Sequence, residues 1–107
     1  MREALKNGTT VTIRPECDIV ASTLNQIRPE LKAAVDGGAT KLIIDFTGID
    51  MIDSMGIGIV IATYNSLKKQ SGALELTNVS AEIANLLKNM RLNQYFTITE
   101  RAELNPN

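Results

Sequence analysis

Two short apolar segments separated by an amphipathic stretch leave few folds open to this chain. Residues 41–46 are rich in β-branched side chains, a composition typical of a central strand covered on both faces, and residues 73–77 predict another strand. Between them apolar residues recur at helical spacing. The buried face of this predicted helix consists of Ile57, Val60, Ile61, Tyr64 and Leu67. Because a helix joins the two strands, they should lie parallel in one sheet, with a right-handed crossover.

The segment before the first of these strands predicts an earlier helix. Its apolar residues follow one helical face over 22–36, and Gly37 provides a glycine stop. Pro29 lies within this helix and lacks the amide that would bond to the carbonyl four residues earlier. We therefore expect a kink, or a late start near Arg28.

The C-terminal quarter predicts one more helix and one more strand. Ser80 can cap a helix over residues 80–90, and residues 95–98 can form a last short strand. The side chains expected to face the core from this helix are Ile83, Leu86, Leu87 and Met90. Residues 101–107 are expected to form a flexible tail.

The N-terminal segment predicts a β-hairpin. Asn7-Gly8 is a favoured two-residue turn because both residues tolerate a positive φ, and alternation over residues 9–14 indicates a half-buried strand. Such a hairpin adds an antiparallel pair to the parallel strands. The expected fold is therefore α/β: a mixed, mostly parallel sheet with an N-terminal hairpin and helices packed against it, in a single domain over residues 1–107.

Composition excludes several classes of function. Lys and Arg total 11 against 12 Asp and Glu, so a formal charge of −1 provides no field to hold nucleic acid or an anionic membrane. The absence of histidine and the single cysteine exclude His-assisted triads, an intrachain disulfide and most zinc sites. No apolar run approaches the ~20 residues of a membrane span, and no secretory signal opens the chain. We expect a cytoplasmic protein that needs no metal and no cofactor, with Cys17 as an inert, mostly buried thiol.

The densest group of polar residues, 50–58, lies between the central strand and the following helix, where α/β proteins often place functional sites. A serine-hydrolase turn would need a glycine where Ile52 stands, and a histidine that the chain lacks. A dinucleotide-binding loop would need a small residue in place of Ile61. The carboxylates that could bind a divalent cation, if they converged, are Asp18, Asp45, Asp50 and Asp53. An enzyme is therefore the least favoured class.

Ser54 allows two interpretations. On local sequence alone, the favoured one is that its side chain caps the helix. Gly56 and Gly58 argue for more, because glycines in a first helical turn each cost ~1 kcal/mol relative to alanine. They would expose the helix start, let another backbone approach closely, and leave the serine hydroxyl reachable by a kinase. Met55 and Ile59 could form an apolar patch beside it.

The segment 42–58 closely resembles the signature of STAS domains, the anti-sigma factor antagonists of bacteria, through its Asp-Ser-x-Gly-hydrophobic-Gly core. Residues 16–18, Glu-Cys-Asp, are similar to the family's Glu-x-Asp segment before the first helix. The C-terminal half is similar through residues 74–77, Ser80, Leu86, Leu87 and Leu92. Two positions depart from the family's pattern, since Met55 replaces a small residue and Pro15 a glycine. The resemblance spans nearly the whole chain.

The resemblance implies a binding switch without catalysis. In that family the serine of the Asp-Ser motif, here Ser54, is phosphorylated by a partner anti-sigma factor, a serine kinase with the histidine-kinase-like ATPase fold. The unphosphorylated antagonist binds the kinase and frees a sigma factor, and the phosphorylated form lets go until a phosphatase of the PP2C type restores it. The partner surface implied here, on a monomer or weak dimer, consists of Asp18, Asp53, Ser54, Met55, Gly56, Ile57, Gly58 and Ile59. The alternative is a ligand-sensing or scaffold STAS module in a signalling or transport assembly, in which Ser54 is only a cap.

Overall fold

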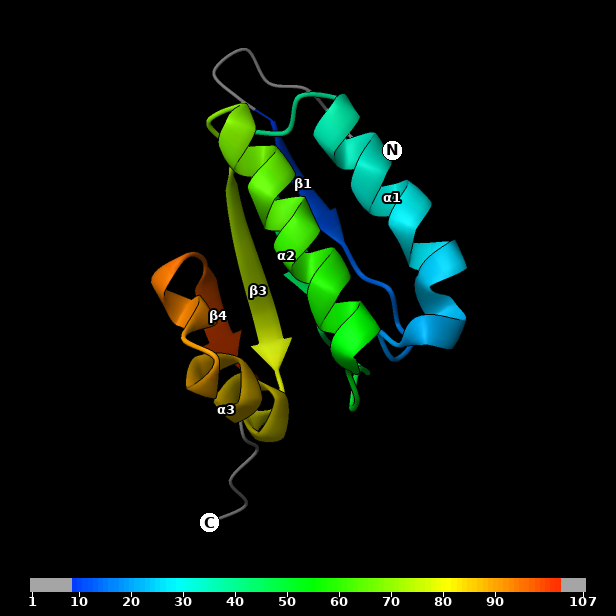
Figure 1. Cartoon of the computed structure of the whole chain (residues 1–107), viewed down its shortest axis with the longest axis vertical. Helices are drawn as coiled ribbons and strands as arrows, with labels where there is room; N and C mark the ends of the chain where they lie inside the picture. Colours follow the sequence, from blue (N-terminus) through cyan, green and yellow to red (C-terminus); the bar gives the residue numbers. More distant parts are fainter. Residues whose placement is uncertain (1–8, 103–107) are drawn as a thin grey trace.

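The computed structural model describes residues 9–102, and within them four strands form one sheet. The strands are β1 (Thr10–Ile13), β2 (Lys41–Asp45), β3 (Ala73–Val79) and β4 (Thr97–Glu100). They lie in the order β1-β2-β3-β4 and every neighbouring pair is parallel, which confirms the predicted parallel sheet with residues 41–46 in its interior (Figure 1). The predicted hairpin turn at Asn7-Gly8 lies outside the described residues.

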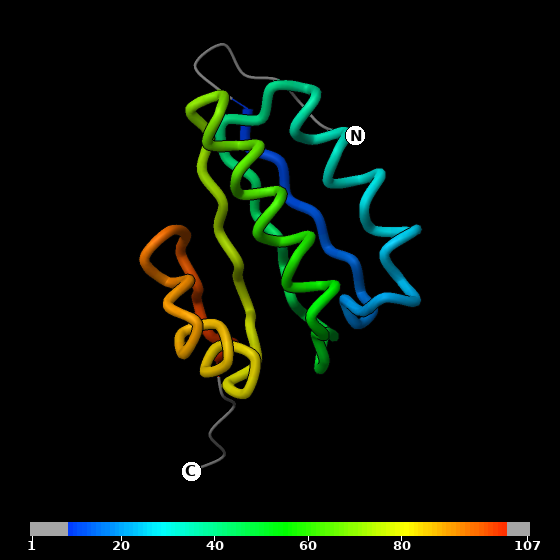
Figure 2. Tube along the Cα trace, in the orientation of Figure 1, coloured from blue at the N-terminus to red at the C-terminus, as the bar shows by residue number. Residues whose placement is uncertain are grey.

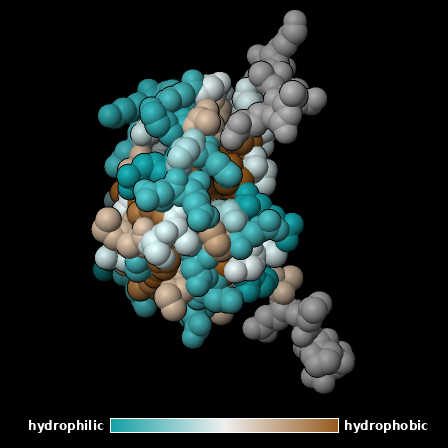
Figure 3. Space-filling view, turned by 90° about the vertical axis from the view of Figure 1, so that its right-hand side faces the viewer, coloured by the Kyte–Doolittle hydropathy of each residue, from teal (hydrophilic) through white to brown (hydrophobic). Residues whose placement is uncertain are grey.

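Three α-helices connect these strands within the described range: α1 (Leu24–Asp36), α2 (Ser54–Lys69) and α3 (Ala81–Asn89). Short 3₁₀ turns precede α1 at Ala21–Thr23 and follow α3 at Leu92–Gln94. Helices α1 and α2 lie side by side across one face of the sheet, and α3 packs near the β4 edge (Figure 1, Figure 2). The side of the molecule formed by α1 presents mostly hydrophilic residues (Figure 3). No helix within residues 9–102 is long and apolar enough to span a membrane.

The two faces of the sheet differ in burial. Leu42 and Ile44 of β2 belong to the core and are at most 1% exposed. Ile43 and Asp45, which alternate with them, are only half-buried. The prediction that this strand is covered on both faces is therefore wrong, because α1 and α2 cover the same face.

Helix α1 runs through Pro29 without interruption. It begins at Leu24, so the predicted late start near Arg28 is wrong. The carbonyl that Pro29 leaves without an amide belongs to Asn25, and both residues are exposed, so water can bond to it. The helix ends at Asp36 with Gly37 as its C-cap, as the glycine stop predicts.

Helix α2 turns a slightly different face to the core from the one predicted. Ile61 and Tyr64 are only half-buried, whereas Thr63, which the prediction omits, is 5% exposed. The Thr63 hydroxyl donates to the Ile59 carbonyl at 2.7 Å, so the polar group is satisfied inside the helix. The buried residues of α2 are Gly56, Ile57, Val60, Thr63 and Leu67.

Helix α3 is capped by Ser80, as predicted, whose hydroxyl accepts the Ile83 amide at 3.2 Å. Its buried residues are Ile83, Ala84 and Leu87. Leu86 and Met90 are 41% and 44% exposed, so their predicted burial is wrong. In a helix this short a narrow stripe of three side chains already fills the contact with the sheet.

The last strand begins two residues later than predicted and extends further. It spans Thr97–Glu100, and the Arg101 amide donates to the Val79 carbonyl at 2.7 Å. Arg101 also bonds through its side chain to the loop after β2. The predicted tail from residue 101 is therefore wrong at Arg101, which is tied into the fold.

Candidate functional site

Two loops meet at the carboxyl end of the parallel sheet, where open α/β sheets commonly bind their partners. The loop after β1 contributes Ile19, and the loop after β2 contributes Ile52, which forms an isolated parallel bridge with it. The Ile19 amide donates to the Met51 carbonyl at 3.1 Å, and the Asp53 amide donates to the Ile19 carbonyl at 3.3 Å. This short ladder fixes the loop that leads into α2.

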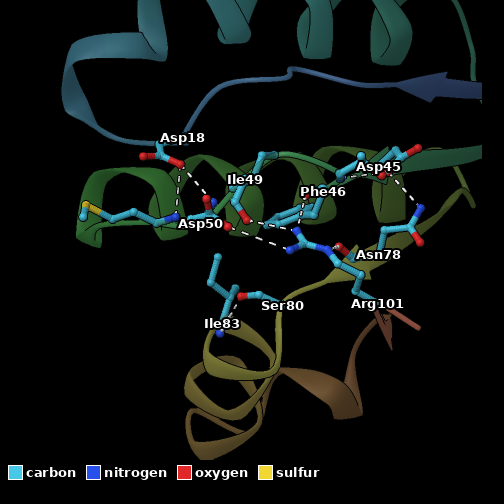
Figure 4. A network of polar contacts seen from close by, with 11 residues as sticks. Asp18, Asp45, Phe46, Ile49, Asp50, Asn78, Ser80, Ile83 and Arg101 are labelled. Atoms are coloured by element: carbon cyan, nitrogen blue, oxygen red, sulfur yellow. Dashed lines mark hydrogen bonds and ion pairs between the residues drawn. The ribbon is translucent and has the colours of Figure 1, made fainter. Parts of the chain in front are cut away.

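Asp18 supports the second loop through its side chain. Its Oδ1 atom accepts the amides of Asp50 at 2.9 Å and Met51 at 3.1 Å (Figure 4). The Asp18 side chain is half-buried in this arrangement. The structure therefore gives Asp18 a role in shaping the predicted partner surface.

Asp53 is the N-cap of α2. Its Oδ1 accepts the Gly56 amide at 2.8 Å, while its Oδ2 accepts the Ala21 amide at 2.9 Å and so links the two loops. The Ala21 amide first, and the Gly56 amide next, lower the pKa of this carboxyl group. The prediction that Ser54 caps the helix is wrong, because Asp53 makes the capping bond.

Ser54 is the first residue of α2 and is exposed. Since the cap comes from Asp53, the Ser54 hydroxyl is not needed to begin the helix. Two residues close to it in sequence are exposed and apolar: Met51 is 58% exposed and Met55 is 55% exposed. Met51 is not among the predicted partner residues, although a methionine within the polar segment 50–54 is a signal that the sequence contains.

The two glycines of the first turns serve different purposes. A side chain at Gly56 would collide with the carbonyl oxygen of Ile19 and would lie 2.8 Å from Cγ1 of Ile52. The close backbone approach predicted here is thus made by the chain itself. A Cβ at Gly58 would meet nothing within 4 Å among the described residues, and Gly58 is exposed.

The remaining predicted partner residues divide by burial. Ile57 is 8% exposed and Gly56 is buried, so both support the surface from below. Ile59 is half-buried and lines a groove of about 220 Å³ between α1 and α2, with Leu31 and Thr63. Ile59 thus belongs to this groove and does not extend the exposed surface of Met55.

Acidic side chains surround the site without converging on one point. Asp50 is exposed, and its carboxylate forms an ion pair of 3.8 Å with Arg101. Asp45 is the last residue of β2. Burial works to raise the pKa of its carboxyl group, but hydrogen bonds from Thr47 and Asn78 outweigh that effect, and the net pKa is lowered. Within residues 9–102, no three acidic or cysteine side chains form a group that could hold a metal ion.

Two further residues differ from their predictions. Arg101, assigned to the tail, donates to carbonyls of the loop that precedes Ser54. No local pattern signals such a contact, because it joins residues 52 or more positions apart. Cys17 is half-buried against the core, so its predicted burial was overstated.

Comparison with known proteins identifies one family. The family model described as the STAS domain matches residues 1–104. The anti-sigma-B factor antagonist of Bacillus subtilis (strain 168) is 29% identical over 98 residues, which cover 92% of this chain and 87% of that protein.

Solved structures share the arrangement of strands and helices. The unphosphorylated form of the anti-sigma factor antagonist SpoIIAA matches with a TM-score of 0.67 and 24% identity, covering 96% of this chain and 88% of SpoIIAA. The phosphorylated form of SpoIIAA, a Bacillus cell fate determinant, matches with a TM-score of 0.68 and 24% identity, covering 92% of this chain and 88% of SpoIIAA. These likenesses establish the fold.

Proposed function

Because this chain belongs to the STAS domain family, we propose that it acts as an anti-sigma factor antagonist, a regulator that works by binding another protein. The observation that carries the proposal is the separation of two roles at the start of α2. Asp53 caps the helix, and the neighbouring Ser54 is exposed and does not make the capping bond. A relative that is 29% identical carries the name of an anti-sigma factor antagonist, which supports the same conclusion.

The proposed partner surface surrounds Ser54. Met51 and Met55 offer exposed, flexible apolar side chains, which suit the anchoring of a partner protein. Gly58, one turn further along α2, leaves room for a partner backbone to come close. Asp18 and Asp53 hold this surface in shape through bonds to backbone amides.

The proposed partner is an anti-sigma factor with serine kinase activity, which phosphorylates Ser54. A phosphate adds about −1.5 to −2 charge at neutral pH. It would lie beside the carboxylates of Asp53 and Asp50, and Asp50 is largely exposed. The enlarged negative charge and the bulk over Met55 would then release the partner. SpoIIAA has been solved in both phosphorylated and unphosphorylated forms, which supports such a switch on this fold.

The remaining parts of the proposal follow from that switch. The unphosphorylated chain would hold the anti-sigma factor and free a sigma factor, and a PP2C-type phosphatase would restore it. The protein would act in the cytoplasm as a monomer or weak dimer, without contact with nucleic acid or insertion into a membrane. It would carry out no catalysis of its own.

A capture experiment followed by location of the phosphorylated residue tests the proposal. The tagged wild-type chain is used to capture its partner from a native lysate, and the purified partner is then incubated with the chain and ATP. We expect mass spectrometry to locate phosphate on Ser54, and we expect none in Ser54→Ala.

Affinity measurements with charge-matched variants complete the test. Ser54→Asp should weaken partner binding by at least about tenfold, a loss typical of a charge placed inside an interface. The matched control is Ser66→Asp, which adds the same charge to an exposed position on the same helix and should bind like the wild type. Phosphate on another residue, or equal affinity of Ser54→Asp and wild type, contradicts the proposal and favours a ligand-sensing or scaffold module.

A further inference from the structure

A single arginine joins the last strand to the loop that precedes Ser54. The Nη2 atom of Arg101 donates to the carbonyls of Phe46 at 2.9 Å and Ile49 at 3.2 Å, and its Nε donates to the Asn78 carbonyl at 3.2 Å. Its Nη1 atom lies 3.8 Å from Oδ1 of Asp50 (Figure 4). One guanidinium therefore contacts the ends of two strands and two positions of the loop.

The backbone of Arg101 is itself fixed. Its amide donates to the Val79 carbonyl at 2.7 Å, directly after β4. Strand β4 pairs with β3, and β3 separates it from β2. The hydrogen bonds of the sheet therefore do not tie β4 to the loop after β2, and the Arg101 side chain supplies that connection.

The loop is held from two sides that meet at Asp50. Arg101 binds the first half, through Phe46, Ile49 and the Asp50 carboxylate. Asp18 binds the second half of the loop, through the amides of Asp50 and Met51. Between the two anchored carbonyls lies Gly48, whose φ of 81° gives the loop a turn that other residues rarely adopt.

We propose that Arg101 is a positioning residue for the phosphorylation switch: it holds residues 46–53 in the conformation that presents Ser54 to the kinase. This inference rests on the proposed function of Ser54. Arginine suits the task because its planar fork directs several donors at once, whereas lysine concentrates its charge at one ammonium group. A lysine at 101 keeps the charge near Asp50 but cannot reach three carbonyls in this geometry.

The test compares a change at Arg101 with a control change at Lys88 of α3, whose side chain pairs with β4. Arg101→Lys removes the fork, and the control Lys88→Gln removes an exposed ion pair with Glu100 that does not touch the loop. Hydrogen exchange of the amides of residues 49–51 is measured, together with kcat/KM for Ser54 phosphorylation. Both are measured at a temperature where circular dichroism shows every variant folded.

For Arg101→Lys we expect about tenfold faster exchange at residues 49–51 and about tenfold lower kcat/KM, the effect of losing charge-assisted bonds. Lys88→Gln should match the wild type in both measurements. Faster exchange with unchanged phosphorylation kinetics would overturn the inference and leave Arg101 a purely structural role. Slower phosphorylation with unchanged exchange would also overturn it. If the wild type is not phosphorylated on Ser54 at all, the proposed function fails and the inference fails with it.

Discussion

Adding one methyl group to each of two glycines should move the stability of the protein in opposite directions. Gly56 and Gly58 are two residues apart on α2 and have the same intrinsic cost of ~1 kcal/mol relative to alanine in a helix. Their surroundings differ: a Cβ at Gly56 collides with the Ile19 carbonyl, whereas a Cβ at Gly58 meets no atom from another part of residues 9–102 within 4 Å.

These surroundings set the expected magnitudes. Gly58→Ala recovers helix propensity and should raise the free energy of unfolding by up to about 1 kcal/mol, or roughly 4 °C in melting temperature for a domain of this size. Gly56→Ala gains the same propensity but must move the backbone at Ile19, an overpacking cost of about 1 to 3 kcal/mol or more. The balance should destabilise the protein, because the nearest blocking atom, the carbonyl oxygen of Ile19, belongs to the backbone and cannot rotate away.

Urea denaturation followed by far-UV circular dichroism measures both changes. If Gly58→Ala destabilises the protein, or if Gly56→Ala leaves its denaturation midpoint unchanged, the packing argument is refuted. Partner binding adds a second, independent measurement for Gly58→Ala. If a partner backbone approaches Gly58, the variant should bind less tightly although its fold is more stable, and unchanged affinity would remove Gly58 from the proposed surface.

Three further predictions follow from the site and the core. Ser54→Ala should change the free energy of unfolding by less than about 0.5 kcal/mol. Asp53→Ala should clearly lower the thermal midpoint, because it removes the helix cap. Equal thermal midpoints for the two variants would contradict the assignment of the cap to Asp53. The pKa values of Asp45 and Asp53 are lowered in the folded state, so their contribution to stability is present above the unfolded pKa of about 3.9 and is lost as pH falls through the lowered values. Urea midpoints between pH 6 and pH 2 should show this loss, and Asp53→Asn should reduce it. Leu67→Ala, at a fully buried position, should cost about 2 to 5 kcal/mol in urea denaturation, and Ile61→Ala, at a half-buried one, about 1 to 2 kcal/mol.

The sequence pattern predicted which segments form helices and strands more accurately than it predicted which helix residues are buried. The short apolar run over residues 41–46, the second strand predicted at 73–77 and the helical spacing between them were sufficient for the parallel pairing of these two strands. Burial on α2 was harder, because Ile61 and Tyr64 lie at the margin of the apolar stripe, where hydrophobicity alone favours burial. Thr63 is buried instead, since its hydroxyl bonds within the helix, and a polar residue of this kind carries no sign of burial in sequence.

The site shows a similar limit. Asp53 and Ser54 are both favoured N-cap residues, and the local sequence does not decide between them. Ala21, which belongs to the segment before α1, favours Asp53 as the cap, because its amide donates to the second carboxylate oxygen of Asp53. Arg101 was missed for the same reason, since its acceptors Phe46 and Ile49 are distant in the chain and are backbone atoms that any residue provides.

The capping bonds of Asp53 also bear on how the proposed phosphorylation would act. A phosphate at a helix start is usually stabilised by the free amides of the first turn. Here the Gly56 amide is already bonded to the Asp53 carboxylate, and the Ile57 amide is bonded to the Asp53 carbonyl. A phosphate on Ser54 would have to displace Asp53 to bind them, and Asp53 is held from its other oxygen by Ala21. With these two amides occupied, we expect the charge of the phosphate to act more on a bound partner than on the conformation of α2.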